Sequence, residues 1–369
     1  MATGAEVLIV GAGPAGIATA IAASQKGLRV TVADARKPPI DKPCGEGLLP
    51  EGVSALQRLG IWLDSSVAFP IAGLRFSDEA SSACGSITRG VAFGLRRSVL
   101  HDLLVRRAVD SGVSFRWGTR VTELNSDHAR LDGVVFPFDW LVGADGQRSA
   151  VRKWSGLGPR RVRSARFGFR CHFAVAPWSE FVEVYWGERC QIYVTPTGPD
   201  EINVAVLTSD PKMRVERALQ HFPAVARRLG DARRISEDTG CQTVLEYPRS
   251  VAQGNVALVG DASFTVDGIT GQGMSLALQQ ALRLGDALAA EDLARYRMAH
   301  GQLIEGPARM ARLLLLLDRQ AWLRRKALRK FAENPNIFAR MISSHANCPR
   351  PAPIRASEMF DLGWQVLRA

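Results

Sequence analysis

The sequence predicts an α/β fold, α+β overall, with a parallel central sheet, a second and mostly antiparallel sheet, and a helical C-terminal tail. Short unbroken apolar runs at 7–10 and 256–259 are typical of strands buried on both faces of a parallel sheet. Between 167 and 207, short segments alternate apolar and polar residues, which indicates an antiparallel sheet. A nearly all-apolar helix is predicted over 274–290, ahead of the tail.

The first apolar run is followed by three glycines, Gly11, Gly13 and Gly16, in G-x-G-x-x-G spacing. Gly11 permits a tight turn, Gly13 lets a pyrophosphate approach the backbone, and Gly16 lets helix and strand pack closely. A helix is predicted next, and then a strand that ends at Asp34, where a carboxylate accepts hydrogen bonds from an adenosine ribose. Because strand, turn, helix and acid agree, the segment predicts a dinucleotide site and not an ordinary turn with a surface aspartate.

The order of the predicted elements divides the chain into three regions. We expect a discontinuous Rossmann-type cofactor-binding domain from 1–70, 93–160 and 249–300. A substrate-binding β-sheet domain is expected from 71–92 and 161–248, with one helix over 213–229. The helical C-terminal region is 301–369. A chain of 369 residues is long enough to bury the cores of two such domains.

Composition limits the classes of function. The glycine fingerprint begins almost at Met1, and the cysteines are scattered without disulfide-like or metal-ligand spacing, so a cytoplasmic protein without a metal site is expected. The formal net charge is +11, but no nucleic-acid recognition motif accompanies it. We therefore expect no nucleic-acid partner, and assign the basic residues to anionic cofactors, acidic membrane surfaces or solvated faces.

Three motifs together resemble the FAD-dependent class A flavoprotein monooxygenase superfamily, which also contains geranylgeranyl reductases and flavin halogenases. They are the glycine fingerprint, the segment Leu-Val-Gly-Ala-Asp-Gly-Gln-Arg-Ser-Ala-Val-Arg at 141–152, and Val-Gly-Asp-Ala-Ser at 259–263 leading to Gly-Gln-Gly at 271–273. The resemblance implies that FAD is bound by Gly11, Gly13, Pro14, Ala15, Gly16, Asp34, Ala35, Arg36, Cys44, Gly45, Arg97, Val121, Asp145, Gly260, Asp261, Gly271, Gln272, Gly273 and Met274.

Two segments are similar to the geranylgeranyl reductase-like branch. The loop Pro-Cys-Gly-Glu-Gly at 43–47 looks like that branch's Cys-Gly loop beside the isoalloxazine, and 265–273 lacks the proline usual in aromatic hydroxylases. The branch's Tyr-x-Trp-x-Phe-Pro signature is absent, and so is the halogenases' Trp-x-Trp-x-Ile-Pro. Cys44 and Glu46 are the candidate catalytic residues, although Cys44 can equally be a small residue that packs on the flavin. His172 alternates with core residues on a strand and is interpreted as structural.

The resemblance implies an NAD(P)H-dependent monooxygenase that hydroxylates an aromatic or polyketide-like hydrophobic molecule through a flavin C4a-hydroperoxide. The alternative is an ene-reductase acting on prenyl or other hydrophobic double bonds. A halogenase and a non-catalytic flavin-binding protein are less favoured. Because the chain has a single dinucleotide fingerprint, NADH or NADPH is expected to bind transiently. A monomer or homodimer is expected.

The tail carries much of the positive charge, with twelve Lys or Arg against five Asp or Glu from Gln302 to Ala369. Leucines and Trp322 alternate with arginines and lysines over 309–331. A helix of this kind can make weak peripheral contact with an anionic membrane. The preferred interpretation is a helix that packs its leucines on the protein, because neighbouring leucines at 313–317 point around the whole helix.

Overall fold

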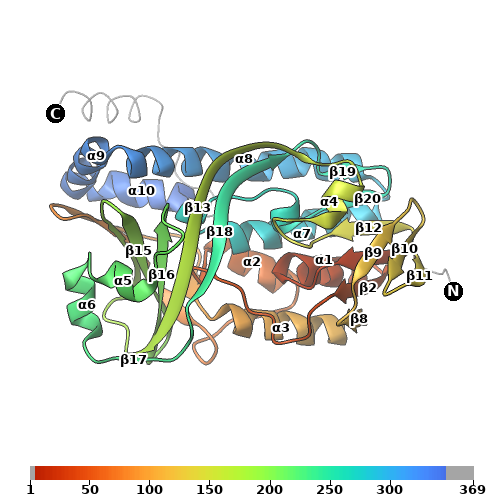
Figure 1. Cartoon of the computed structure of the whole chain (residues 1–369), viewed down its shortest axis with the longest axis horizontal. Helices are drawn as coiled ribbons and strands as arrows, with labels where there is room; N and C mark the ends of the chain where they lie inside the picture. Colours follow the sequence, from red (N-terminus) through yellow and green to blue (C-terminus); the bar gives the residue numbers. More distant parts are fainter. Residues whose placement is uncertain (1–4, 346–369) are drawn as a thin grey trace.

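The computed structural model describes residues 5–345, without the side chains of 159–165 and Ser344. A six-stranded sheet forms one end of the molecule (Figure 1). Its order is β19-β20-β12-β1-β2-β8, and all neighbours are parallel except β19 and β20. The strands are β1 (Glu6–Val10), β2 (Arg29–Asp34), β8 (Ser114–Trp117), β12 (Trp140–Gly143), β19 (Ala252–Gln253) and β20 (Val256–Leu258). The predicted parallel sheet is confirmed.

Four helices pack together beside this sheet: α1 (Pro14–Ser24), α2 (Pro50–Arg58), α3 (Arg97–Asp110) and α7 (Gly273–Ala289). Glycines allow two of the helix contacts. A Cβ at Gly285 of α7 would lie 2.7 Å from the Cβ of Ala22 in α1, and a Cβ at Gly52 of α2 would lie 2.5 Å from Oγ of Ser275. The predicted buried character of 274–290 follows from this packing, because α7 is enclosed between α1 and α2.

An eight-stranded, mostly antiparallel sheet forms the other end. Its order is β17-β13-β16-β15-β14-β5-β6, and β18 also pairs with β13. The strands are β5 (Gly73–Ser77), β6 (Ser82–Ser86), β13 (Pro159–Ala174), β14 (Phe181–Trp186), β15 (Cys190–Gly198), β16 (Glu201–Thr208), β17 (Arg233–Arg234) and β18 (Thr239–Pro248). The long ribbon of β13 and β18 reaches from one sheet to the other (Figure 1).

Two three-stranded sheets complete the β structure. The first contains β9 (Val121–Leu124), β10 (His128–Leu131) and β11 (Val134–Pro137). The second contains β3 (Gly47–Leu48), β4 (Phe69–Ile71) and β7 (Ala92–Gly94). Short helices are α4 (Ala150–Trp154), η1 (Gly260–Ala262) and η2 (Gly268–Thr270).

The single helix predicted over 213–229 is wrong. The structure has two short helices there, α5 (Val215–Leu219) and α6 (Pro223–Leu229). Pro223 has no N–H to donate, so it begins a helix at its first position and cannot continue one.

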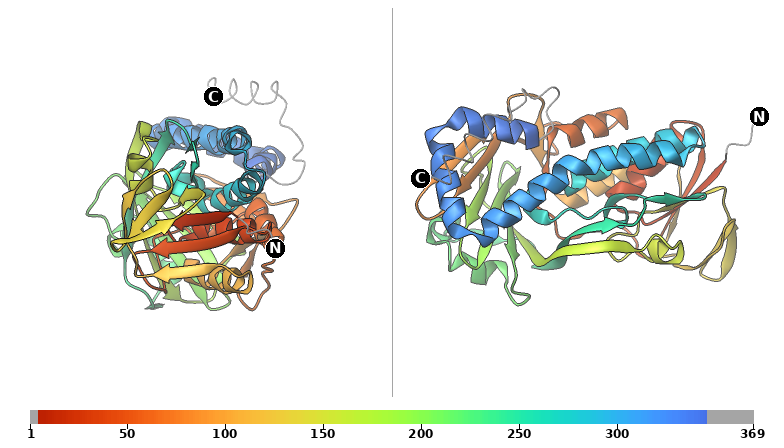
Figure 2. Two further views of the ribbon diagram at one scale, coloured as in Figure 1. Left: turned by 90° about the vertical axis from the view of Figure 1, so that its right-hand side faces the viewer. Right: turned by 90° about the horizontal axis from the view of Figure 1, so that it is seen from above.

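The C-terminal helices are α8 (Leu293–Arg319), α9 (Ala321–Glu333) and α10 (Pro335–His345). Figure 2 shows α8 running along most of the molecule's length. Leu314, Leu315 and Leu317 are buried in one core cluster with Leu328 and Phe331 of α9 and side chains of the eight-stranded sheet. This agrees with the preferred interpretation of the leucines. None of the helices between residues 5 and 345 is long and apolar enough to cross a membrane. The predicted region beyond 345 lies outside the described residues.

Candidate functional site

The glycine turn after β1 has the geometry that its spacing predicts. Gly11 has φ +110°, and a Cβ there would lie 2.4 Å from the carbonyl oxygen of Ala144, while one at Gly16 would lie 2.0 Å from the carbonyl oxygen of Gly11. Neither position accepts a side chain. At Gly13, which caps α1 ahead of Pro14, the nearest atom to an added Cβ is 3.9 Å away, at the tip of Arg97. Gly13 therefore leaves room for a ligand to reach the helix start.

Asp34 ends β2 beside this turn, as predicted. One carboxylate oxygen accepts the N–H of Ala12 at 2.8 Å, and the other accepts the N–H of Arg36, beyond Ala35, at 2.8 Å. Each oxygen keeps a lone pair for a further donor. Asp34 thus fixes the shape of the turn while it stays able to bind a sugar hydroxyl.

Lys42 was not predicted from the sequence. An added Cβ at Gly146 would lie 3.5 Å from its Nζ, so Lys42 reaches the turn that contains Asp145. Burial, followed by the charges of Arg36 and Arg97, lowers the pKa of the Lys42 ammonium. Three cations thus lie near one another close to the start of α1, where a diphosphate would need counter-charge. A lysine in an irregular loop carries no signal of this role, because its neighbours come from distant parts of the chain.

Asp145 and Asp261 follow adjacent parallel strands, β12 and β20. Asp145 accepts the N–H groups of Ala150 at 2.7 Å and Val151 at 3.1 Å, and its other oxygen is buried without a described partner. Asp261 is exposed as a residue. Burial of its carboxyl raises the pKa of this group, and the charge of Lys42 acts in the opposite direction.

The segment before α7 is the other predicted contact with the flavin. Gly271 has φ +65°, and neither Gly271 nor Gly273 has an atom within 4 Å of an added Cβ. Gln272 donates to the carbonyl of His345 at 2.7 Å, while its side-chain oxygen is buried without a described partner. Met274 is buried in the first turn of α7. The helix start and its free space suit a ligand that carries partial negative charge.

Gly260 and Val121 complete the predicted cofactor set. Gly260 has φ +62°, and an added Cβ would lie 2.6 Å from the Cβ of Ala15, which places the turn after β20 against the first turn of α1. Val121 is the buried first residue of β9. Its predicted backbone contact with adenine stays a prediction.

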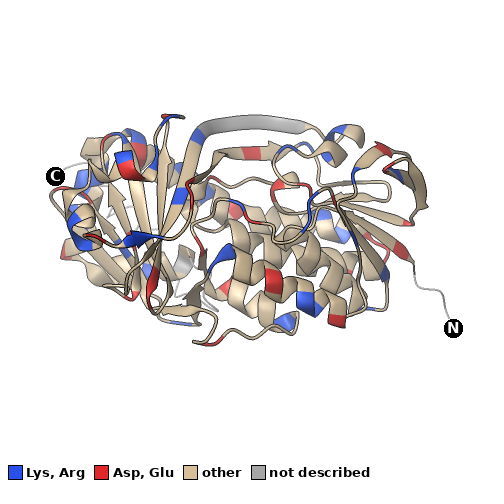
Figure 3. Cartoon of the chain, turned by 60° about the horizontal axis from the view of Figure 1, so that its bottom comes forward, with Lys and Arg blue, Asp and Glu red and all other residues tan. Residues whose placement is uncertain are grey.

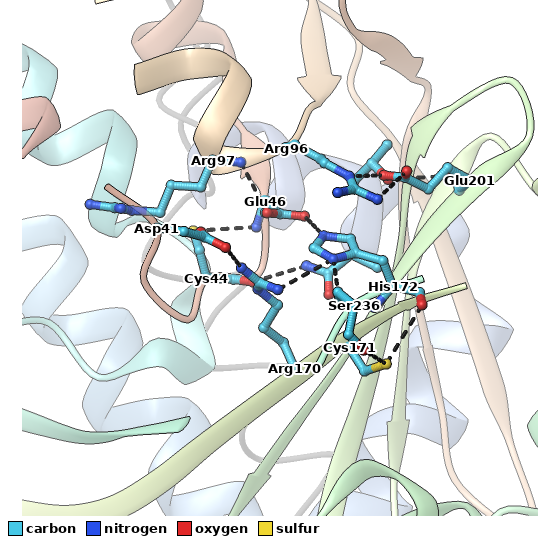
Figure 4. Close-up of polar contacts among 12 residues, drawn as sticks. Asp41, Cys44, Glu46, Arg96, Arg97, Arg170, Cys171, His172, Glu201 and Ser236 are labelled. Carbon is cyan, nitrogen blue, oxygen red and sulfur yellow. Dashed lines mark hydrogen bonds and ion pairs between the residues drawn. The ribbon is translucent and has the colours of Figure 1, made fainter. Parts of the chain in front are cut away.

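Glu46 is the most constrained residue of the loop at 43–47. It has φ +61°, a backbone conformation that is uncommon for residues other than glycine, and its side chain is 1 % exposed. Its carboxylate accepts the N–H of Arg97 at 2.9 Å, and its carbonyl accepts the N–H of Leu95 at 3.0 Å. The other carboxylate oxygen lies 2.6 Å from Nε2 of His172 in β13 (Figure 4). Glu46 thus connects the loop with the start of α3 and with β13 of the eight-stranded sheet.

Cys44 lies two residues before Glu46 and is partly buried. Burial, and then the charge of Glu46, raises the pKa of the Cys44 thiol to about 11, so the group is a protonated thiol at neutral pH. Asn203 of β16 donates to the Cys44 carbonyl at 2.9 Å. Next to it, Gly45 is exposed, with no atom within 4 Å of an added Cβ. The catalytic roles of Cys44 and Glu46 stay predictions.

FAD fits these residues. Four glycines, Gly13, Gly45, Gly271 and Gly273, leave open space where their side chains would be, so a planar or phosphorylated ligand can approach the backbone. The cations near α1 suit a diphosphate, and Asp34 suits a ribose. When bound, FAD supplies two-electron redox chemistry, and the chain supplies binding and orientation.

A family described as "FAD binding domain" matches residues 4–294. The chain belongs to this family. Its curated relatives include a menaquinone reductase of Mycolicibacterium smegmatis, 29 % identical over 86 % of each chain. They also include a 3-hydroxy-4-methyl-anthranilyl-[aryl-carrier protein] 5-monooxygenase of Streptosporangium sibiricum, 29 % identical over 84 % of this chain and 87 % of the relative.

Among solved structures, the flavin-dependent brominase Bmp2 is similar, with a TM-score of 0.82 over 99 % of each chain and 20 % identity. At that identity the likeness shows the fold alone. The superfamily resemblance, the FAD cofactor and the two-sheet fold are therefore confirmed. The protein is an FAD-dependent oxidoreductase, and support for the geranylgeranyl reductase-like branch is weaker.

Proposed function

We propose that the protein is an NAD(P)H-dependent monooxygenase that hydroxylates an aromatic or polyketide-like hydrophobic molecule. The observation that carries this proposal is the family match over 4–294 together with a relative named as a monooxygenase that spans 84 % of this chain. The open glycines support an FAD site that the backbone can approach closely. The proposed substrate side is the eight-stranded sheet, which reaches the flavin-facing loop through Asn203 and His172.

The chain's own residues serve such a reaction by binding, orienting and protecting the reactants. The helix starts at Gly13 and Gly273 hold negative charge on the cofactor. The hydrogen bonds of Glu46 fix the loop that carries Cys44 and Gly45. A loop fixed in this way can exclude water from the reacting centre, which protects reactive oxygen chemistry from side reactions.

An ene-reductase is the second candidate, and two observations favour it. A menaquinone reductase is among the relatives. The pKa of the Cys44 thiol is raised to about 11, so the thiol is protonated at neutral pH. Reduction of a carbon–carbon double bond needs a proton as well as a hydride, and a protonated thiol beside the flavin is one source of it.

Oxygen dependence separates the two candidates. Purified holoenzyme is incubated with NADH or NADPH and a panel of hydrophobic aromatic, polyketide-like and prenylated compounds, with and without O2. The monooxygenase predicts products that gain one oxygen atom, labelled when ¹⁸O2 is supplied. Products that gain two hydrogen atoms under anaerobic conditions would instead establish the ene-reductase. A rise in the anaerobic rate of flavin reduction with one compound identifies the reductant and the substrate class together.

The assembly, location and domain boundaries are part of the same proposal. We propose a cytoplasmic monomer or homodimer, with a cofactor-binding domain from 1–70, 93–160 and 249–300, a substrate-binding domain from 71–92 and 161–248, and a C-terminal region from 301. The contacts of β13 and β18 with both sheets support a substrate domain held against the cofactor domain.

Membrane contact through 309–331 stays a prediction. Leu313, Leu316 and Trp322 are exposed. Figure 3 shows Lys and Arg interspersed with Asp and Glu over the molecule. The prediction requires the protein to sediment with anionic vesicles at low salt and to be released at high salt. A protein that stays in the supernatant at low salt has a purely structural C-terminal region.

A further inference from the structure

We propose that Glu46, His172 and Ser236 form a proton relay that leads from solvent to the loop at the flavin. Polar contacts connect the three side chains in the order Glu46, His172 and Ser236 (Figure 4). His172 Nε2 lies 2.6 Å from Glu46 Oε2, and His172 Nδ1 lies 3.0 Å from Ser236 Oγ. Both distances suit direct proton transfer between neighbouring groups.

The relay joins a buried end to an open end. Glu46 and His172 are 1 % and 2 % exposed, whereas Ser236 is only half-buried. Ser236 lines an open recess of about 540 Å³, together with Arg233, Arg234, Ile235 and Glu237. Water in this recess can exchange protons with the Ser236 hydroxyl. At the other end, Glu46 follows Gly45, the exposed residue of the loop predicted to face the flavin.

The neighbours of His172 fix the position of its proton. Arg170 Nη1 lies 3.3 Å from Nδ1, and a guanidinium can only donate, so Nδ1 accepts and carries no proton. The proton is then on Nε2, where it is donated to Glu46. The backbone N–H of His172 donates to Ser236 Oγ at 2.9 Å, which leaves the Ser236 hydroxyl proton free to point at Nδ1. The Ser236 hydroxyl proton and the Nε2 proton therefore both point toward Glu46.

This arrangement delivers protons inward. A proton passes from Ser236 to Nδ1 as the Nε2 proton passes to Glu46, and water in the recess restores the serine. After Glu46 has passed this proton on toward the flavin side, the ring carries its proton on Nδ1, and it must turn or exchange that proton for one on Nε2 before the next transfer. No net charge is left on His172, which suits the place of the ring beside the Arg170 guanidinium.

Other charged groups around the relay are paired with one another. Arg170 forms an ion pair with Asp41, and Arg96 forms a bidentate pair with Glu201 at 2.7 and 2.5 Å. Further titratable or charged groups on the packed elements are Cys44, Arg97, Cys171, Arg234, Glu237 and Asp238. With the surrounding cations mostly neutralised, His172 is the polar group that connects Glu46 with the recess.

The relay goes beyond the proposed function, and it rests on FAD chemistry at this site. Hydroxylation follows NAD(P)H + H⁺ + O2 + RH → NAD(P)⁺ + ROH + H2O, so each turnover consumes one proton. Reduction of a double bond by NAD(P)H consumes one proton as well. Either reaction inside a site closed to water needs a path that brings this proton in.

The test measures proton uptake without substrate or nicotinamide. Holoenzyme is photoreduced without O2 and then mixed with O2 in weak buffer containing a pH indicator dye. Reoxidation of the reduced flavin to FAD and H2O2 takes up one proton, and flavin absorbance is followed in parallel. We expect His172→Gln, which keeps a donor toward Glu46 but cannot relay, to slow proton uptake about tenfold or more. Ser236→Ala should slow proton uptake less than His172→Gln does, and its solvent isotope effect on proton uptake should be larger than that of wild type.

Ser111→Ala is the matched control, because Ser111 is also half-buried, donates one hydrogen bond to Arg107 at 2.8 Å and lies at the end of α3. It should behave as wild type. Normal FAD content with wild-type proton uptake in both relay variants would overturn the relay. If His172→Gln fails to fold, Ser236→Ala alone decides. Wild-type protein that binds no FAD would overturn the proposed function and the relay with it.

Discussion

Glu46 and Glu183 are both 1 % exposed, but their surroundings differ in the charge they supply. Glu183, in β14, forms ion pairs with Arg75 at 2.9 Å and Arg228 at 3.3 Å. It also accepts hydrogen bonds from Trp178 at 2.8 Å and from the hydroxyl of Tyr185. Two permanent cations and two neutral donors hold this carboxylate.

Among the described residues, Glu46 receives two hydrogen bonds and has no arginine or lysine side chain in ion-pair contact. One donor is the Arg97 backbone and the other is His172, which can be neutral. The nearby guanidinium groups of Arg96 and Arg170 are paired with Glu201 and Asp41. The difference teaches that two equally buried carboxylates can have partners of different chemistry: Glu183 contacts arginines, which stay charged, whereas Glu46 contacts an imidazole, which can take up or release a proton.

The largest expected effect follows from breaking the Glu183 cluster. Glu183→Ala leaves two arginines, a tryptophan and a tyrosine without their common acceptor. We expect it to lower the free energy of unfolding by about 2 kcal/mol, less than for a fully buried ion pair, because the Arg75 and Arg228 side chains are 35 % and 47 % exposed and can be solvated. Denaturant titration measures this. Glu180→Gln, at an exposed carboxylate in the loop before β14, should change stability by less than about 0.5 kcal/mol. Equal losses of unfolding free energy in Glu183→Ala and Glu180→Gln would contradict a special role of the contacts around Glu183.

Glu51 sharpens the comparison, because one of its carboxylate oxygens is buried without a hydrogen-bond partner among the described residues. Burial raises the pKa of Glu51 from 4.5 to about 8. The folded state then favours the protonated form, so stability falls as pH rises from about 4.5 to about 8, and the full cost is present above 8. Glu51→Gln should be more stable than wild type at pH 8 and above by about 2 kcal/mol, since the group is partly exposed.

Thermal or denaturant unfolding at several pH values checks this prediction. The stability gain of Glu51→Gln should shrink toward zero as the pH falls to about 4.5, because both states of wild type are then protonated. A gain that does not vary with pH would show that packing, and not charge, is responsible.

The smallest expected effect concerns the influence of Glu46 on Cys44. Because the charge of Glu46 is the second cause, after burial, of the raised pKa of the Cys44 thiol, Glu46→Gln should lower this pKa. Alkylation of Cys44, followed peptide by peptide by mass spectrometry, should then be a few-fold faster at pH 8. Cys190, whose pKa burial and Asp318 raise to about 11, serves as the internal control. Faster reaction of both cysteines would indicate general loosening instead.

The sequence predicts what depends on neighbouring residues. Gly11, Gly16 and Asp34 act within one strand–turn–helix unit, so their spacing is sufficient to place them. The pair of Glu46 and His172 joins residues 126 positions apart, and alternation shows only that His172 points to one face of a strand. The interpretation of His172 as structural stays a prediction, and it does not give the partner of the side chain.

Other features depend on distant contacts in the same way. Lys42 has no recognisable motif, and its position near Arg97 and Asp261 arises from the path of an irregular loop. The clustering of Arg75, Arg228 and Trp178 around Glu183 requires three separate elements to meet. The predicted single helix over 213–229 is wrong for a local reason, because Pro223 begins a new helix and cannot continue the one before it.

The ribbon of β13 and β18 has a consequence for exchanging parts between related enzymes. Pro159 and Pro248 are paired across the ribbon, so the 88 residues between them leave and return at adjacent points of the chain. The register shifts of the ribbon lie near this end, and the pairing from Ala165 to Arg170 is regular. A segment with neighbouring ends can be replaced as one cassette. Grafting 159–248 from a relative onto this chain would then transfer its half of the site, His172 included, while Glu46 stays behind.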